Sequence, residues 1–153
     1  MRVLVIGASG AIGTRLVPQL IDRGHEVIGT SRSPRNADRV RALGARPIVL
    51  DLRDPNAVRE AVLKTAPDAI VNEATALADV QFSKNLDRSF VQTNRIRTEG
   101  TDAVLAAAGE AGVSRVVAQS FASLRYAREG GPVNTEDDPL DPVPIEGTQA
   151  TSG

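Results

Sequence analysis

The sequence contains no cysteine and no tryptophan, and it has one histidine, one tyrosine and two lysines. Without cysteine the chain cannot form a disulfide or a thiolate metal site. A lone histidine, His25, cannot supply a histidine pair for zinc, so we predict no metal site. The formal net charge of −1 and the lack of a long basic run argue against nucleic acid or an acidic membrane surface as a partner.

Long apolar segments are also missing. No segment approaches the roughly 20 apolar residues of a membrane span, and the first apolar stretch is too short and too rich in glycine for a secretory signal. We therefore expect a cytoplasmic protein without a membrane partner. The 153 residues, of which 41% are hydrophobic, are enough for one domain with a core. We predict this domain over residues 1–128, followed by a loop or tail rich in proline, glycine and acidic residues over residues 129–153.

Three glycines stand out near the start, in MRVLVIGASGAIGTRLV. Gly7, Gly10 and Gly13 are spaced three residues apart, between a short apolar run and a segment with helical spacing of apolar residues. A strand-to-helix turn of this kind lets a pyrophosphate lie on the N-terminus of the helix, where backbone N–H groups and the helix dipole favour negative charge. The alternative is a tight turn that binds no ligand.

Short strand patterns alternate with helical patterns along the rest of the chain. Strands are expected within residues 2–6, 25–31, 46–52, 68–74 and 114–120. This alternation predicts a doubly wound α/β fold of the Rossmann type, with a five-stranded parallel sheet in the order 3-2-1-4-5. Ligands of such sheets bind at the carboxyl ends of the strands, here between the first and fourth strands.

One long helix is predicted from about residue 87 to residue 111, ending at Gly112. Its spacing suggests a single face made of Phe90, Val91, Asn94, Thr98, Thr101, Leu105 and Ala108.

The segment GTSRSPR, at the end of the second strand, bears on the choice of nucleotide. An NAD-preferring site usually has an acidic residue here, whereas a 2′-phosphate is better matched by arginine. The segment has Ser31, Arg32 and Arg35 but no acid, which favours NADP over NAD, with NAD still possible. It also argues against a methyltransferase. The alternative for both arginines is a solvated surface position.

These motifs resemble a known family, the short-chain dehydrogenases/reductases, and within it the extended NAD(P)-dependent epimerase/dehydratase group. The resemblance runs from Met1 to about Pro142, and GASGAIG matches the G-x-x-G-x-x-G turn of the group. Together with the motifs above, it implies a cofactor site made of Gly7, Ser9, Gly10, Ala11, Ile12, Gly13, Ser31, Arg32, Asp51, Leu52, Ala74, Thr75 and Asn94.

The resemblance also implies roles for individual residues. Asp51 and Leu52 correspond to positions beside the adenine ring, and Ala74 and Thr75 in DAIVNEAT to positions near the cofactor ribose. Asn94 falls where a helix asparagine is common in the group. RVVAQSFAS resembles the end of the fifth strand that carries a catalytic serine or threonine. This makes Ser120 the matching residue, with Ser123 as a less suitable stand-in.

The chain departs from the family in its acid–base pair. Family chemistry uses a tyrosine whose pKa is lowered by a lysine four residues later, but Tyr126 is followed four residues on by Gly130. Both lysines, Lys64 and Lys84, lie upstream. Tyr126 stays a candidate for proton transfer from a different position. We therefore expect this chain alone to bind NADP(H) with no more than trace turnover.

Three functions follow as alternatives. The first is an oxidoreductase or epimerase acting on a small carbonyl compound or a sugar nucleotide. The second is a non-catalytic module that senses NADP(H) or binds a partner. The third is a truncated or frame-altered product, suggested by the change of composition after Pro142. The first two have a dinucleotide and an unknown small molecule as partners, and a homodimer is left open.

Overall fold

In the computed structural model, the description covers the 153-residue chain except residues 78–85, 121–132, 134, 136 and 140–153. Strands and helices alternate from the start: β1 (Arg2–Ile6), α1 (Gly13–Asp22), β2 (Glu26–Ser31), α2 (Pro34–Ala42), β3 (Arg46–Val49), α3 (Pro55–Thr65) and β4 (Ala69–Asn72). A long helical region follows, made of α4 (Leu86–Arg95), a π-helical turn η2 (Ile96–Gly100) and α5 (Thr101–Ala111), and β5 (Val116–Ala118) completes the sheet.

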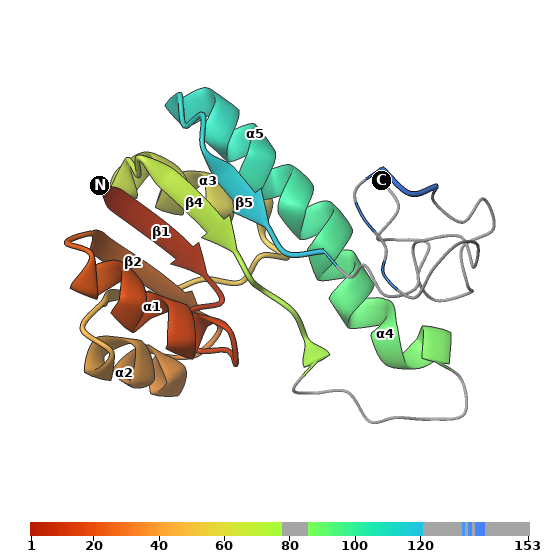
Figure 1. Ribbon diagram of the computed structural model, residues 1–153, viewed down its shortest axis with the longest axis horizontal. Coiled ribbons are helices and arrows are strands. Elements are labelled where there is room, and N and C mark those ends of the chain that lie inside the picture. Colours follow the sequence, from red (N-terminus) through yellow and green to blue (C-terminus); the bar gives the residue numbers. More distant parts are fainter. Residues whose placement is uncertain (78–85, 121–132, 134, 136, 140–153) are drawn as a thin grey trace.

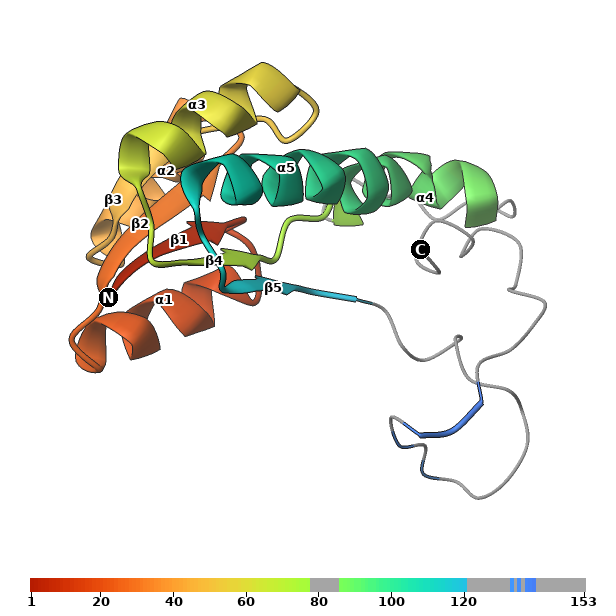
Figure 2. The ribbon, with the colours of Figure 1, turned by 90° about the horizontal axis from the view of Figure 1, so that it is seen from above.

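The five strands form one parallel sheet in the order β3-β2-β1-β4-β5 (Figures 1 and 2), which confirms the predicted fold and strand order. The connections from β1 to β2 and from β2 to β3 move toward one edge of the sheet. The connection from β4 to β5 moves toward the other edge. β1 and β4 are therefore neighbours whose following loops leave in opposite directions. This arrangement opens a crevice at the carboxyl ends of these two strands.

Each face of the sheet carries its own core because side chains alternate along a strand. Val3 and Val5 of β1 pack with Val17 of α1 and Val40 of α2. On the other face, Leu4 and Ile6 belong to a cluster of residues from α3 and α5, including Val58, Val62, Val104 and Ala107. Figure 2 shows the sheet with α1 on one side and α3 and α5 on the other.

Local sequence signals explain where several helices begin and end. Ser33 caps α2 by accepting a hydrogen bond from the Asn36 N–H at 3.3 Å, and Asp54 caps α3 by accepting from the Asn56 and Ala57 N–H groups. A proline follows each cap as the first helical residue, where its missing N–H costs nothing. Gly112 ends α5 in the left-handed conformation, with φ 71°.

The predicted face of the long helix is wrong in its details. Val91 and Leu105 are 53% and 50% exposed, although Ala108 is buried as expected. The residues that turn inward are mostly small: Thr93, Ile96, Gly100, Val104, Ala107 and Ala108. A β-carbon at Gly100 would lie only 3.2 Å from the Leu52 β-carbon, so this helix packs too closely for large side chains on that face.

Candidate functional site

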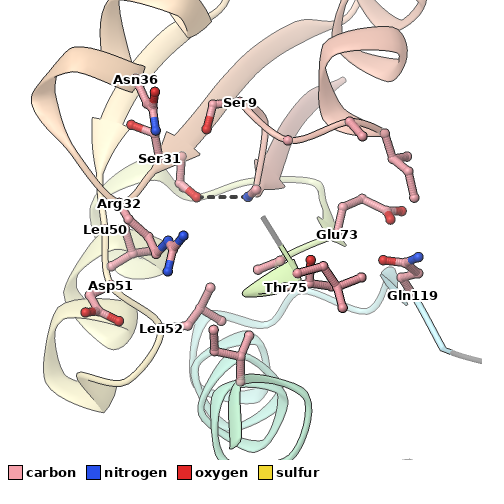
Figure 3. Close-up of a pocket in the computed structure, with 18 of the residues that line it drawn as sticks. Ser9, Ser31, Arg32, Asn36, Leu50, Asp51, Leu52, Glu73, Thr75 and Gln119 are labelled. Atoms are coloured by element: carbon pink, nitrogen blue, oxygen red, sulfur yellow. Dashed lines mark hydrogen bonds between the residues drawn. The ribbon is translucent and has the colours of Figure 1, made fainter. Parts of the chain in front are cut away.

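A cavity of about 480 Å³ lies at the carboxyl edge of the sheet, over the crevice between β1 and β4. The loops after β1, β2, β3, β4 and β5 line it, together with residues of α2 and η2 (Figure 3). The lining residues are Gly7, Ser9, Gly10, Ala11, Ile12, Thr30, Ser31, Arg32, Asn36, Arg39, Leu50, Asp51, Leu52, Glu73, Ala74, Thr75, Leu77, Ile96 and Gln119.

The glycine turn forms the centre of this cavity. Gly7 has φ +85°, a conformation that other residues rarely adopt. Its N–H donates to Thr30 Oγ1 at 3.2 Å, and the Gly10 N–H donates to the Gly7 carbonyl oxygen at 2.9 Å. Gly7 also lies against the segment after β4, because a β-carbon there would be 3.0 Å from the Ala74 nitrogen. The turn is therefore held by contacts on both sides.

The N-terminus of α1 lacks the side-chain cap that α2 and α3 have. Its N-cap residue is Ile12, which makes no capping hydrogen bond through its side chain. Gly10, Ala11 and Ile12 all line the cavity, so this helix end faces the open space. The first N–H groups of a helix have no partner within the helix and carry the positive end of its dipole. The geometry suits an anionic group bound at the N-terminus of α1.

One end of the cavity is basic and lies beyond β2 and β3. Arg32 follows β2 directly, and Asn36 and Arg39 line the same end from α2. Figure 3 shows Arg32 and Asp51 together at this end, away from Glu73 and Gln119. Asp51 is already paired, because Arg53 Nη2 lies 2.5 Å from its Oδ2. This hydrogen bond, assisted by the charge of Arg32, lowers the pKa of Asp51.

The other end of the cavity is formed by the loop after β4 and the residue after β5. Asn72, buried at the end of β4, accepts from the Ala74 N–H at 3.2 Å and donates to Thr101 Oγ1 of α5 at 3.2 Å. Thr93 Oγ1 accepts from the Ala76 N–H at 3.3 Å. Two polar side chains thus fix the backbone that presents residues 73–76 to the cavity.

Glu73 is the acidic residue at this end. Its Oε2 is buried and has no hydrogen-bond partner within the described part of the chain. Burial raises the pKa of the Glu73 carboxyl, because removal from water disfavours the charged form. Gln119 lines the cavity on the same side (Figure 3).

The structure brings together most of the residues that the sequence proposed for the cofactor. Eleven of the thirteen line the cavity: Gly7, Ser9, Gly10, Ala11, Ile12, Ser31, Arg32, Asp51, Leu52, Ala74 and Thr75. Gly13 lies behind the turn, where it packs against Gly7 and Ala8. Asn94 is half-buried in α4 and is not among the lining residues.

The proposed catalytic residues are less well placed. Ser120 is exposed and does not line the cavity, although the preceding Gln119 does. Tyr126 and Ser123 lie outside the described residues, as does the predicted boundary at residue 128. Their roles therefore stay predictions from the sequence.

Several lining residues were missed by sequence reasoning. Asn36 and Arg39 lie in α2, and their approach to the cavity depends on how that helix packs. Glu73 and Gln119 each directly follow a strand, β4 and β5. A polar residue at the carboxyl end of a parallel strand is a signal that could have identified both.

Two further observations concern metals and membranes. Within the described residues, no group of three or more His, Cys, Asp or Glu side chains is arranged to hold a metal ion. None of the helices in that part of the chain combines the length and apolar character needed to cross a membrane.

Comparison with known proteins gives a consistent result. The model of the NAD dependent epimerase/dehydratase family matches residues 3–147. A 3-diazoavenalumate denitrifying reductase from a Streptomyces species is 44% identical over 144 residues, which cover 92% of this chain and 44% of that protein. A 4-hydroxy-2-methyl-3-oxo-4-farnesyl-3,4-dihydroquinoline-1-oxide ketoreductase from Stigmatella aurantiaca is 33% identical over 153 residues, which cover 99% of this chain and 42% of that protein.

A solved structure is also similar. The Bordetella bronchiseptica enzyme WbmG, crystallised with NAD and UDP, superimposes with a TM-score of 0.74 and 25% sequence identity, covering 99% of this chain and 47% of that one. The chain thus spans less than half the length of each of these three proteins.

Proposed function

Since the chain belongs to the NAD dependent epimerase/dehydratase family, we propose that it is the dinucleotide-binding part of an NADP(H)-dependent reductase. The observation that carries this proposal is the uncapped N-terminus of α1 at the centre of the cavity, behind the glycine turn. The cofactor pyrophosphate would lie there, within reach of the backbone N–H groups of residues 11 and 12.

The residues present fit a dinucleotide. Gly10 lines the cavity at the N-terminus of α1, so a larger side chain there would compete for the space that the pyrophosphate needs. Leu50, Leu52 and Ile96 supply an apolar surface beside the basic end, suitable for a purine ring. When bound, the cofactor would donate or accept a hydride at its nicotinamide ring. The chain's own residues bind and orient it.

NADP rather than NAD is supported by the charges at the basic end. Arg32 and Arg39 line the cavity there, and the acidic residue Asp51 already pairs with Arg53. An arginine forms charge-assisted hydrogen bonds with a 2′-phosphate, whereas a free carboxylate would repel it.

Reduction is supported by the relatives, because the Streptomyces and Stigmatella proteins are named as reductases. We propose a small carbonyl compound as substrate. A sugar nucleotide is the second candidate, because WbmG was crystallised with UDP. A cytoplasmic location stays a prediction from the sequence, and the oligomeric state stays open.

Calorimetric titration of the 153-residue chain with NADPH and NADH tests the proposal. NADPH should bind, and it should bind at least tenfold more tightly than NADH. The Gly10→Val variant serves as the control that should lose both cofactors, because Gly10 lines the cavity where the pyrophosphate is proposed to bind. Absence of binding by either cofactor to the folded chain would contradict the proposal, and equal affinities would contradict the preference for NADP.

A further inference from the structure

Two acidic side chains line the described cavity, and their surroundings differ. Asp51 forms an ion pair with Arg53, and its carboxylate accepts hydrogen bonds from the backbone N–H and from the side chain of Arg53. Glu73 has no ion pair with any described residue, and its buried Oε2 accepts no hydrogen bond in that part of the chain. A buried carboxylate oxygen without a donor is costly unless a bound molecule provides one.

Glu73 lies next to the glycine turn but on the side opposite to Arg32. Its N–H donates to the Ile6 carbonyl oxygen at 2.9 Å, and its carbonyl carbon would lie 3.0 Å from a β-carbon at Gly7. Figure 3 shows its carboxyl group on the same side as Gln119, with Arg32 and Asp51 across the cavity. Glu73 thus lies just beyond the position proposed for the pyrophosphate.

The order of the groups in a dinucleotide then defines what lies beside Glu73. With the adenosine 2′-phosphate at Arg32 and the pyrophosphate at α1, the next group along the cofactor is the second ribose. A ribose presents two adjacent hydroxyl groups, which donate hydrogen bonds to a carboxylate. An acidic residue holds the adenosine ribose of NAD by the same chemistry at the end of the second strand in other dinucleotide-binding folds.

We propose that the Glu73 carboxylate accepts hydrogen bonds from the hydroxyl groups of the nicotinamide-side ribose of the cofactor. This inference rests on the proposed binding of NADP(H). It gives Glu73 a role in binding and orienting the reactive half of the cofactor.

The test uses three ligands that extend to different points along the cofactor. NADPH carries the second ribose and the nicotinamide, 2′-phospho-ADP-ribose ends at the second ribose, and adenosine 2′,5′-bisphosphate ends at the first 5′-phosphate. Calorimetry would compare the wild-type chain with Glu73→Leu and Glu73→Gln. Glu73→Leu should weaken NADPH and 2′-phospho-ADP-ribose about tenfold or more, the usual effect of losing charge-assisted hydrogen bonds. Adenosine 2′,5′-bisphosphate should change by less than about twofold.

Two variants keep the comparison interpretable. Glu73→Gln preserves the shape of the side chain and loses its charge. It should weaken the same two ligands by a smaller factor than Glu73→Leu, because the amide oxygen still accepts hydrogen bonds. Glu99→Gln removes an equal charge on η2, where Glu99 pairs with Arg95 outside the cavity, and it should leave all three affinities unchanged.

The outcomes separate this inference from the function on which it rests. If the wild-type chain binds none of the three ligands, the proposed function fails and the role of Glu73 fails with it. If the wild type binds them and Glu73→Leu changes nothing, weakens all three equally or tightens NADPH, the inference alone is overturned. Tighter binding would mean that Glu73 repels the pyrophosphate.

Discussion

A β-carbon at position 13 would lie 2.5 Å from the carbonyl oxygen of Gly7. It would also lie 2.6 and 2.7 Å from main-chain atoms of Ala8, so nothing flexible can move aside. We expect Gly13→Ala to lower the free energy of unfolding by at least about 1–3 kcal/mol, the usual cost of overpacking. Urea unfolding measures this directly.

Gly109→Ala is the matched control for that substitution. Gly109 lies in α5, and a β-carbon there would meet nothing within 4 Å. Because alanine favours helix more than glycine, this variant should gain about 0.5–1 kcal/mol in the free energy of unfolding. Equal changes in the free energy of unfolding for Gly13→Ala and Gly109→Ala would contradict the close contact between Gly13 and Gly7.

Arg32 and Arg35 carry the same charge three residues apart, but only Arg32 lines the cavity. We expect Arg32→Ala to reduce the preference for NADPH over NADH by about 1.5–3 kcal/mol, the worth of a hydrogen bond to a charged group. Arg35→Ala should leave the preference unchanged because Arg35 is exposed outside the cavity. Titration with both cofactors decides the point, and a similar loss in both variants would indicate a general charge effect.

Asn72 connects β4, the cavity loop and α5 through its two hydrogen bonds. In Asn72→Leu the Ala74 N–H and the Thr101 hydroxyl lose their partner, so the free energy of unfolding should fall by about 1–3 kcal/mol. Thr101→Val removes only one of the two bonds and should cost about 0.5–1.5 kcal/mol. Titration of both variants should show weaker NADPH binding in Asn72→Leu alone, because only there is the backbone of Ala74 released.

Glu73 should lower the stability of the cofactor-free chain at neutral pH. Its pKa is raised by burial in the folded state, so the carboxyl ionises more readily in the unfolded chain. The destabilising effect is absent below the unfolded pKa of about 4.3, grows as the pH rises from there to the folded pKa, and is fully present above the folded pKa. Glu73→Gln should therefore raise the Tm at pH 7, and this gain should disappear at pH 3. A gain of the same size at both pH values would rule out ionisation as its cause.

The sequence was sufficient to predict the strand order and most of the cavity lining. Alternating strand and helix patterns leave few topologies open, and a glycine turn after the first strand locates the site. The inward face of the long helix was not predictable in the same way. The face predicted from helical spacing included Val91 and Leu105, which are exposed, whereas close packing against Leu52 requires Gly100.

Some of the missed residues take up their positions only through tertiary packing. Arg39 lies in the body of α2, and nothing in the local pattern of charges separates it from the neighbouring surface arginine Arg41. Asn72 resembles any polar residue at a strand end until its contact with Thr101, 29 positions later, is known.

The π-helical turn η2 connects α4 and α5 into one continuous rod (Figure 1) and sets how the two are rotated relative to each other. Each residue of an α-helix advances the chain by about 100° around the axis. Deleting one codon within residues 96–100 would turn α4 by about that angle against α5. Thr93 would then move away from Ala76, and the loop after β4 would lose its support. The length of this helical rod between Thr93 and Thr101 is fixed, because Thr93 bonds to Ala76 in the loop after β4 and Thr101 bonds to Asn72 at the end of β4.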